Sequence, residues 1–426
     1  FFNIQLGAIA SEITLCGGES ATDYIGIQQI DDMTHYPENN VLRQIWQFLY
    51  EGVNRANYME ENKANIDFEG KEAMYGEVYF LRAYYYFELV KFFGDVPLFT
   101  EARLTAGQAG TLTRTPKDEV YAQIELDLQN AIASLPNSQS QVGRVNKYTA
   151  YALLGKVLLY QDKFAEAASA LDNVIGVYSL VSDYGSQFLR FGENGPESVF
   201  EIQYSNQSNW YDWGCAHCSE GNYAIIMNGP RGWSGPEYAQ GWSFNVPTEE
   251  FYNSFEEGDS RRDATVLDIE AFAAATGSSY TEGYDHTGYF NNKYIPRAGE
   301  SGGQTELNYL TNFRIIRYSD VLLMAAEAYN RGGIDDGLAQ EFLNQVRRRA
   351  FGGDDNDISA SGSALTDAIW EERKFELSLE GHRFFDLVRT GRASSLIAGF
   401  VEGKHEVFPI PQQEVDISGL TQNAGY

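Results

Sequence analysis

The stretch from Lys147 to Gly176 reads KYTAYALLGKVLLYQDKFAEAASALDNVIG, and it decides the fold class. Its apolar and small residues recur at the spacings of a tetratricopeptide repeat. These residues are Tyr151, Leu154, Gly155, Leu158, Ala167, Leu171 and Val174. The small Gly155 and Ala167 allow two antiparallel helices to approach, while the larger residues fill the seam between them. We therefore expect a helix pair here, as one unit of a helical repeat.

The helical pattern continues on both sides of this unit. Further segments carry residues at helical spacing: 45–56, 75–93 and 121–135 before it, and the pair 318–330 and 338–350 long after it. Gly94 and Pro97 should end the helix over 75–93. The chain is therefore expected to be mostly α, a tetratricopeptide-like scaffold that a long insertion interrupts.

The insertion differs in composition from the scaffold. Residues 182–312 are rich in Gly, Tyr, Trp, Asn and Ser, with short apolar runs that are typical of loops and short strands. Four of the six tryptophans lie in it: Trp210, Trp213, Trp233 and Trp242. We expect one domain over 1–426, with a helical scaffold at 1–180 and 313–400, an irregular ligand-binding insertion at 182–312, and a C-terminal clamp at 401–426.

The segment Ile369–Arg392, IWEERKFELSLEGHRFFDLVRTGR, places charges of both signs between apolar residues at helical spacing. Such alternation is typical of a solvated, salt-bridged helix face. Gly381 should bend or end the helix. Glu372 and Glu376 have the spacing of an acid/base pair, but the neighbouring arginines would hold both ionised. We therefore expect this segment to be architectural, and no catalytic residue is predicted.

The charge of the chain limits its partners. Asp and Glu number 60 against 31 Lys and Arg, a formal net charge of −29. Repulsion opposes nucleic acid, anionic membrane surfaces and polyanionic ligands. The aromatic content is high, with 28 Tyr, 26 Phe and 6 Trp. A neutral ligand is the better expectation.

Cysteines and the N-terminus add little chemistry. Cys16 is expected to be a small buried residue, and Cys215 and Cys218 have CxxC spacing that leaves metal binding, a local disulfide and free thiols open. The sequence has no run of about 20 apolar residues that would cross a membrane. It begins inside an apparent helix, so we expect that an N-terminal portion precedes it.

Five segments, in this order, resemble the SusD/RagB family of outer-membrane nutrient-binding lipoproteins. They are Leu81–Leu98, Arg144–Tyr160, Gly258–Asp263, Phe313–Ala328 and Ile369–Arg392. The resemblance implies about four tetratricopeptide-like helix pairs and an irregular ligand-binding region. It also implies a protein without catalytic activity on the extracellular face of the outer membrane, held by an N-terminal lipid anchor that is absent from this chain. Its partners would be a SusC-like TonB-dependent transporter and an oligo- or polysaccharide, and no nucleic acid.

The expected ligand residues combine aromatic rings with polar neighbours, because sugars stack their C–H faces on rings and bond their hydroxyls at the rim. From the insertion these are Asn209, Trp210, Tyr211, Trp213, Tyr223 and Trp233. By resemblance, the loop Gly17–Asn39 adds Asp23 and Tyr36. The competing interpretation is that each tryptophan only fills an irregular core, and that Asp23 or Asp31 caps a helix. Trp46 and Trp370 are expected in the core.

Other functions stay open at this point. The RagB branch of the family suggests a peptide ligand instead of a glycan, and a tetratricopeptide scaffold can also dock proteins without any small ligand. A glycoside hydrolase would need two carboxylates about 5–9.5 Å apart, which sequence spacing cannot show. No cofactor is expected. A Ca²⁺ ion is compatible with so acidic a surface, but the sequence does not localise one.

Overall fold

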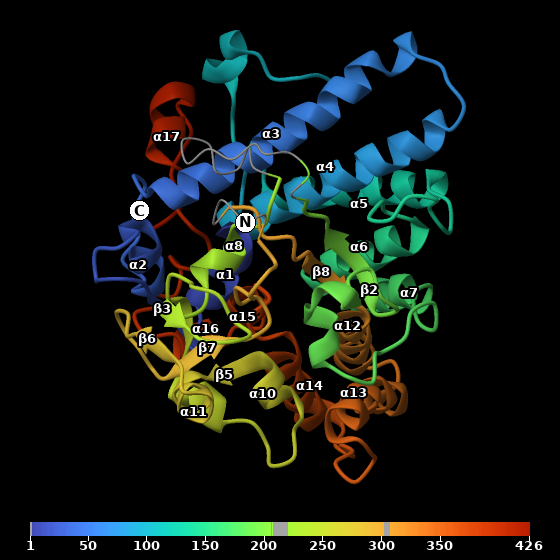
Figure 1. Ribbon diagram of the computed structural model, residues 1–426. Helices are drawn as coiled ribbons and strands as arrows, with labels where there is room; N and C mark the ends of the chain where they lie inside the picture. The colour runs from blue at the N-terminus through green and yellow to red at the C-terminus, as the bar shows by residue number, and fades with distance from the viewer. Residues whose placement is uncertain (1, 206, 208–219, 302–306) are drawn as a thin grey trace. The chain divides into compact units, whose positions relative to one another are not determined.

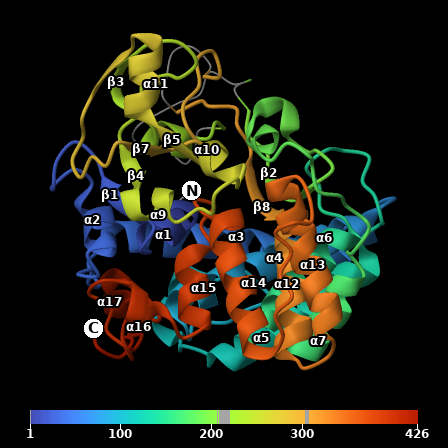
Figure 2. The ribbon, with the colours of Figure 1, turned by 90° about the horizontal axis from the view of Figure 1, so that it is seen from below.

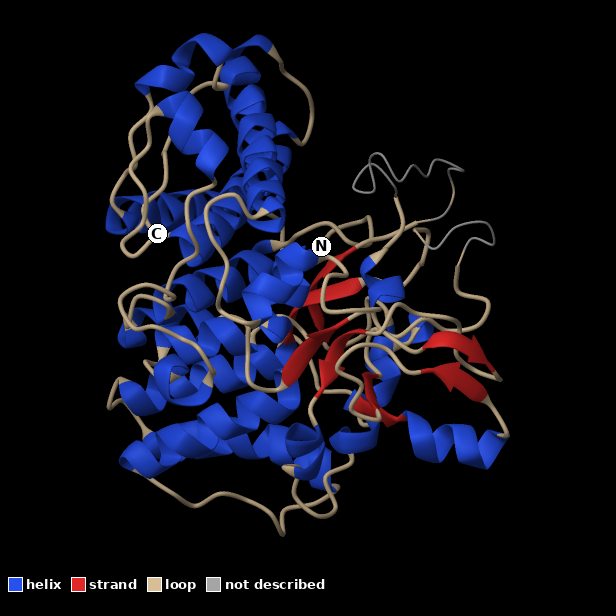
Figure 3. Cartoon of the chain, turned by 90° about the vertical axis from the view of Figure 1, so that its left-hand side faces the viewer, coloured by secondary structure: helices blue, strands red, loops and turns tan. Residues whose placement is uncertain are grey.

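The computed structural model describes residues 2–205, 207, 220–301 and 307–426. The chain forms two compact units. Unit 1 comprises Phe1–Thr34 and Tyr178–Gly399, and unit 2 comprises His35–Val177 and Phe400–Tyr426. Helices dominate the fold and the strands are short, as Figure 3 shows. The expected mostly α class is confirmed.

Unit 2 is built from helices that follow one another in the chain. They are α3 (Asn40–Asn62), α4 (Lys71–Phe93), α5 (Lys117–Ser134), α6 (Lys147–Leu159), α7 (Phe164–Asp172) and α17 (Gln412–Ser418), with 3₁₀ turns η1 (Lys63–Asn65) and η2 (Ala106–Thr111). From α3 to α7 each helix packs on the next, and α3 and α4 are the long neighbouring ribbons of Figure 1. Asn39 caps α3 by accepting from the Val41 and Leu42 amides. Gly94 ends α4 with φ of 70°, as predicted.

The decisive stretch 147–176 forms the pair α6 and α7. A Cβ on Gly155 would lie 2.5 Å from the Leu171 side chain on α7, so only glycine allows this approach. Ala167 is fully buried. The small residues therefore act as the repeat pattern predicts. Trp46 on α3 is only 4% exposed, which confirms it as a core residue.

Unit 1 contains most of the irregular structure and the later helices. Its helices are α1 (Phe2–Ile9), α2 (Ile25–Asp31), α8 (Ala224–Met227), α9 (Glu249–Asn253), α10 (Arg261–Thr265), α11 (Ile269–Thr276), α12 (Tyr318–Arg331), α13 (Asp336–Phe351), α14 (Gly362–Leu377), α15 (Arg383–Arg389) and α16 (Ala393–Leu396), with 3₁₀ turns η3 (Gly185–Phe188) and η4 (Arg190–Gly192). Helices α12, α13 and α14 pack against one another (Figure 2), and the predicted pair 318–330 and 338–350 corresponds to α12 and α13.

The described strands of unit 1 form four two-stranded antiparallel sheets. The strands are β1 (Thr14–Gly17), β2 (Ser198–Ile202), β3 (Arg231–Ser234), β4 (Phe244–Pro247), β5 (Val266–Asp268), β6 (Ser279–Thr281), β7 (Tyr289–Asn291) and β8 (Phe313–Arg317). The pairs are β1 with β4, β2 with β8, β3 with β6, and β5 with β7. Two strands alone bury little, so these ribbons depend on side-chain packing around them.

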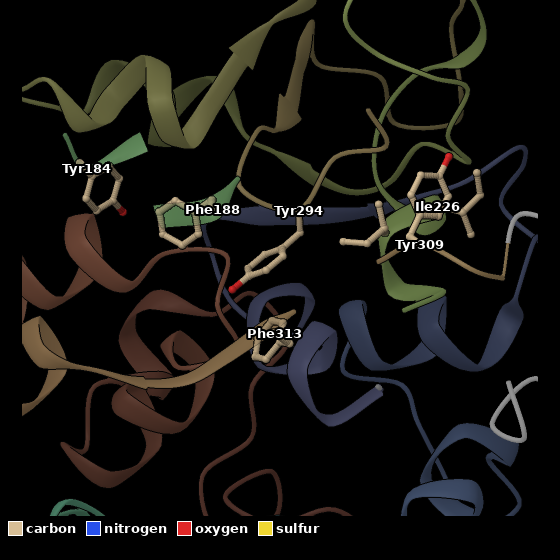
Figure 4. Close-up of a cluster of buried hydrophobic side chains, with 7 residues drawn as sticks. Tyr184, Phe188, Ile226, Tyr294, Tyr309 and Phe313 are labelled. Carbon is tan, nitrogen blue, oxygen red and sulfur yellow. The ribbon is translucent and has the colours of Figure 1, made fainter. Parts of the chain in front are cut away.

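Aromatic side chains provide that packing. One buried cluster joins Tyr184, just before η3, with residues from η3, α8, β8 and the loops before β8 (Figure 4). It contains Tyr184, Phe188, Ile225, Ile226, Tyr294, Tyr309 and Phe313, with Trp242 partly buried against it. Tyr294 and Phe313 stack with ring centroids 4.7 Å apart. The Tyr-rich composition of the insertion is therefore used largely for core packing.

The charged segment 369–392 is salt-bridged as predicted, but the prediction that its charges are solvated is wrong. Glu376 on α14 is fully buried and accepts from Arg317 at 2.9 Å, Arg349 at 2.6 Å and Arg261 at 3.1 Å. Burial alone would raise the pKa of Glu376, but the surrounding arginines hold it well below its ordinary value. Its cationic partners come from distant segments, so the local pattern could not show that the charges are enclosed.

The predicted break at Gly381 is confirmed. Helix α14 ends at Leu377 and α15 begins at Arg383, and Gly381 lies between them with φ of 85°. Trp370 is half-buried and thus only partly in the core, with the Arg392 guanidinium 4.5 Å from its ring centroid. Cys16 is a buried free thiol, as expected.

Candidate functional site

A turn between β1 and α2 carries Asp23 in unit 1. The Asp23 Oδ2 atom accepts from the Glu19 amide at 2.8 Å and from Arg231 Nη2 at 2.8 Å. Glu19 also approaches Arg231, at 3.6 Å. The cap residue of α2 is Tyr24, and no Asp23 side-chain hydrogen bond to the amides of this helix is present among the described residues. Asp23 is thus part of an ion pair and not a helix cap.

Arg231 reaches Asp23 from β3. Along this strand Arg231 and Trp233 are half-buried, while Gly232 and Ser234 are exposed, which places the first two on one face. The side chain of Arg231 is 22% exposed, and its Nε atom is buried without a hydrogen-bond partner among the described residues. The guanidinium therefore keeps donor capacity beyond its bond to Asp23.

Trp233 is packed more closely than a free stacking platform would be. Its ring lies edge-on to Tyr238 at 6.1 Å between centroids and is tilted against Phe272 at 5.9 Å. The indole N–H is buried and has no acceptor in the described part of the chain. The ring is thus used largely for core packing, and only its indole N–H is left without a hydrogen-bond acceptor among the described residues.

Tyr223 is held in place by its neighbour in the chain. Asn222 donates from Nδ2 to the Thr311 carbonyl at 2.8 Å, and its amide donates to the Tyr309 carbonyl at 2.7 Å. Burial raises the pKa of Tyr223, and the nearby hydroxyls of Tyr24 and Tyr204 add to the rise. The structure thus gathers three tyrosine hydroxyls from separate segments of unit 1.

Tyr284 is a residue of the candidate site that no local sequence pattern indicates. The Tyr284 amide donates to the Gly18 carbonyl at 2.8 Å, which fixes its loop against the Asp23 turn. A Cβ on Gly283 would lie 2.6 Å from the same carbonyl oxygen, so glycine is needed for this close approach. The Tyr284 side chain is 37% exposed. It offers an accessible ring beside the Asp23 turn.

Asp31 has a different environment from Asp23. Its Oδ2 accepts from the Cys16 amide at 2.7 Å, and burial raises its pKa to about 7. It lies in the last turn of α2, so it caps no helix N-terminus. Asp31 joins α2 to β1 through this hydrogen bond.

Several predicted residues fall elsewhere. Asn209, Trp210, Tyr211 and Trp213 lie outside the described residues, as do Cys215 and Cys218. Tyr36 lies in unit 2, where its side chain is 46% exposed. The structure brings together Asp23 with Arg231, and it places Tyr223 and Trp233 in the same unit. The roles of all these residues in binding stay predictions.

The described residues contain neither a metal centre nor a membrane span. No group of three or more His, Cys, Asp or Glu side chains in them is arranged to hold a metal ion. No described helix is both long and apolar enough to span a lipid bilayer. The Asp23–Arg231 pair can both accept and donate hydrogen bonds. Each member also has an aromatic residue close to it in the sequence, Tyr24 after Asp23 and Trp233 after Arg231.

The chain matches two family models. The model described as "SusD family" matches residues 196–399, and the one described as "Starch-binding associating with outer membrane" matches residues 17–159. A curated relative, SusD-like protein P2 of Formosa agariphila, is 29% identical over 94% of this chain and 83% of its own length.

Solved structures agree with the family models. A laminarin-binding SusD-like protein is 37% identical, with a TM-score of 0.89 over 99% of this chain and 94% of that one. Surface glycan-binding protein A from Bacteroides thetaiotaomicron, solved in complex with laminarihexaose, is 30% identical, with a TM-score of 0.88 over 98% of this chain and 93% of that one. Family models, sequence relatives and structures thus agree over nearly the whole length, and the chain belongs to the SusD-like family.

Proposed function

We propose that this protein captures an oligo- or polysaccharide at the cell surface and delivers it to a partner TonB-dependent transporter of the outer membrane. The observation that carries the proposal is the match, over 99% of the chain, to a laminarin-binding SusD-like protein. The site geometry in unit 1 supports it. The description of the second family model, which names the outer membrane, supports a location at that membrane.

The ligand class follows from the same neighbours. Both a laminarin-binding protein and a laminarihexaose complex are similar to this chain at 30% identity or more. Laminarin is a neutral glucan, and the net charge of −29 disfavours acidic polysaccharides. We therefore propose a laminarin-type glucan as the ligand.

The Asp23–Arg231 pair suits a sugar with neighbouring hydroxyls. Each hydroxyl can donate to a carboxylate and accept from a guanidinium, so adjacent hydroxyls can bond both members of the pair. The accessible Tyr284 ring offers a face for the C–H side of a pyranose. With two or three such contacts, less the cost of ordering a flexible glycan, the Kd should be roughly micromolar to millimolar.

The same geometry favours binding without hydrolysis. A glycosidase that uses two carboxyl groups needs one protonated as acid and the other ionised. Asp23 and Glu19 both approach the Arg231 guanidinium, at 2.8 and 3.6 Å, so the two carboxyl groups share one cationic partner. We propose that the protein hands on its ligand intact.

The test uses affinity gel electrophoresis against laminarin, starch and other neutral polysaccharides. The wild type should be retarded by laminarin, and Asp23→Asn and Arg231→Ala should each weaken binding about tenfold or more. Asp263→Asn and Arg262→Ala are matched controls, because that exposed pair lies on α10 of the same unit. Unchanged binding in both site variants would remove the Asp23–Arg231 pair from the proposal.

A triple variant tests the aromatic prediction separately. Replacing Trp210, Trp213 and Trp233 by alanine should abolish retardation if any of these rings stacks on the sugar. If the protein binds members of a peptide library and no polysaccharide retards it, the ligand is a peptide and not a glycan. Release of reducing sugar by the purified protein would contradict the non-catalytic role.

A further inference from the structure

Unit 2 contains a cavity of about 800 Å³ that the proposed site in unit 1 does not use. Its volume lies within the range of pockets that enclose small organic ligands. Every residue that lines it belongs to unit 2. The cavity is therefore distinct from the Asp23–Arg231 pair, which belongs to unit 1.

The floor of the cavity is one face of α3. Trp46, Tyr50, Asn54 and Tyr58 follow at intervals of four residues, so their side chains line one stripe of the helix. The helix rises about 18 Å from the first of them to the last. The cavity is therefore an elongated groove, longer than a single apolar side chain needs.

The opposite wall is the segment after α4, and hydrogen bonds from α3 fix its position. The Tyr50 hydroxyl donates to the Pro97 carbonyl at 2.7 Å, and Asn57 Nδ2 donates to the Phe99 carbonyl at 2.8 Å. The Leu104 amide donates to Asn54 Oδ1 at 2.9 Å. Three successive points of the wall are thus bonded to the floor.

A buried arginine strengthens the same wall. Arg82 on α4 donates from Nη1 to the Thr100 carbonyl at 2.6 Å, and it forms two hydrogen bonds with Asp127 on α5 at 2.7 and 2.8 Å. Arg82 and Asp127 are both almost fully buried. Since moving the wall would remove the donors of the Thr100, Pro97 and Phe99 carbonyls, the groove is preformed.

Aromatic rings line the apolar part of the groove. Tyr50 stacks on Phe99 with centroids 5.7 Å apart and ring planes 13° apart. Trp46 packs against Tyr50 at 4.9 Å and closes the floor beneath it. Tyr58 is 47% exposed at the other end. The Arg103 guanidinium lies over the Tyr58 ring, 4.4 Å from its centroid. Phe99 and the part of Tyr58 that stays exposed thus offer ring surface to an occupant.

The charges on the rim favour a neutral occupant. Arg55 is already paired with Glu51, and Arg103 is paired with Glu61 at 3.0 Å. An anion would have to displace these carboxylates against the negative charge of the whole chain. A cation would meet both arginines at the rim. Neither class of ion therefore meets an unpaired partner of opposite sign among these four described rim charges.

Unused polar groups remain inside. Glu414 on α17 is half-buried, and its carboxyl forms no side-chain hydrogen bond within the described part of the chain. Gln47, which also lines the groove, is exposed. Burial raises the pKa of Glu414, with Arg43 opposing the rise. Such a carboxyl gains most from an occupant that donates hydroxyl hydrogen bonds.

We propose that this groove is a second carbohydrate site, which binds a short neutral saccharide by its ring faces and hydroxyls. An acyl chain would need apolar walls throughout, whereas six of the fifteen lining residues carry an amide or a charge. The combination of rings, amides and one unbonded carboxyl matches a hydroxyl-rich ring. The inference goes beyond the site in unit 1 and is tested apart from it.

The experiment is hydrogen exchange with mass spectrometry, followed on residues 97–112 and 412–420 with and without millimolar laminarihexaose. The protein carries Arg231→Ala, so that binding at the unit 1 site is weakened. Laminarihexaose should slow exchange in both segments. Adding Tyr58→Ala or Glu414→Gln should weaken this protection about tenfold.

The controls are Phe48→Ala, an exposed ring on α3 outside the groove, and Glu402→Gln, an exposed carboxylate of unit 2. Both should leave the protection unchanged. Glu414→Gln should not lower the melting temperature, because a half-buried carboxyl whose pKa is raised by burial costs stability at neutral pH. Loss of binding in this variant is therefore separable from loss of folding.

Three outcomes overturn the proposal. Protection by decanol, with none by laminarihexaose or maltohexaose, would assign the groove to an apolar chain. Protection by none of these compounds would leave the groove without a small ligand. If the wild type binds laminarin but these segments show no protection, the second site fails while the proposed function stands. A fourth outcome would support the groove as a carbohydrate site: these segments are protected, and Arg231→Ala leaves laminarin binding unaffected. In that case the Asp23–Arg231 pair would not be a binding site.

Discussion

Asp23 and Arg231 lie 208 positions apart in the chain, and one hydrogen bond of 2.8 Å joins them. Each keeps hydrogen-bonding capacity, since a carboxylate has a second oxygen and the guanidinium of Arg231, whose side chain is 22% exposed, carries further N–H donors. A carboxylate paired with a guanidinium binds a group that both donates and accepts hydrogen bonds, such as a hydroxyl, better than it binds an ion. At the scale of single residues, this is the strongest indication of a hydroxylated ligand.

A second carboxyl in unit 1 gives a prediction about pH. The folded-state pKa of Asp31 is raised to about 7 by burial, whereas an exposed aspartate titrates near 3.8. Between these values the folded protein holds a proton that the unfolded chain has lost, so stability falls as the pH rises through this window. Above about pH 7 the full cost, at most about 4 kcal/mol, is present.

Asp31→Asn removes this cost and should stabilise the protein at pH 8 more than at pH 5. Urea unfolding of wild type and variant at both pH values measures the difference. Asp355→Asn is the control, because Asp355 is an exposed aspartate of the same unit. Equal effects of Asp31→Asn at the two pH values would contradict the raised pKa.

At the scale of elements, the pair α6 and α7 depends on one close contact. A Cβ on Gly155 would lie 2.5 Å from Leu171 Cγ. Gly155→Ala gains helix propensity of about 1 kcal/mol, but the clash should outweigh it and destabilise the protein by about 1–2 kcal/mol net.

Combining Gly155→Ala with Leu171→Ala should recover part of the loss from Leu171→Ala alone, because the new methyl group fills part of the cavity. Thermal and urea unfolding of the two single variants and the double variant measure this coupling. A more stable Gly155→Ala variant would contradict the close helix contact.

Removing an ion-pair partner of the charged helix α14 should destabilise the protein more than Gly155→Ala does. Arg317 contacts Glu197, Glu376 and Glu380, and all of these are buried. Arg317→Met should cost about 3–5 kcal/mol in urea unfolding, since it leaves carboxylates buried without this partner. Arg55→Met in the exposed i,i+4 pair with Glu51 should change stability by less than about 1 kcal/mol. A cost for Arg317→Met as small as that of Arg55→Met would show that the network is hydrated.

These elements also show what the sequence could predict. Helical periodicity located α3 to α7 and α12 to α14, and Gly94 and Gly381 marked chain breaks, because both signals are local. The burial of the α14 charges was missed, because their partners Arg261, Arg317 and Arg349 come from other elements. Arg231 and Tyr284 were missed for the same reason: only the folded chain brings them to Asp23.

At the scale of the whole molecule, the composition agrees with the family assignment. The net charge of −29 disfavours anionic partners, and the match to SusD-like structures extends over nearly the entire chain. The aromatic residues serve two purposes. Many fill the irregular core of unit 1, as in the buried cluster that contains Tyr184 and Phe313. A few, such as Tyr284, remain exposed. Composition alone could not separate these two groups.

Binding of a neutral glucan at the Asp23–Arg231 pair can be measured by isothermal titration calorimetry of laminarihexaose into wild type and Arg231→Ala. We expect saturable binding by the wild type with a Kd between about micromolar and millimolar, and binding at least about tenfold weaker in the variant. No binding of laminarihexaose or laminarin by the wild type, or equal affinity in the two proteins, would contradict it.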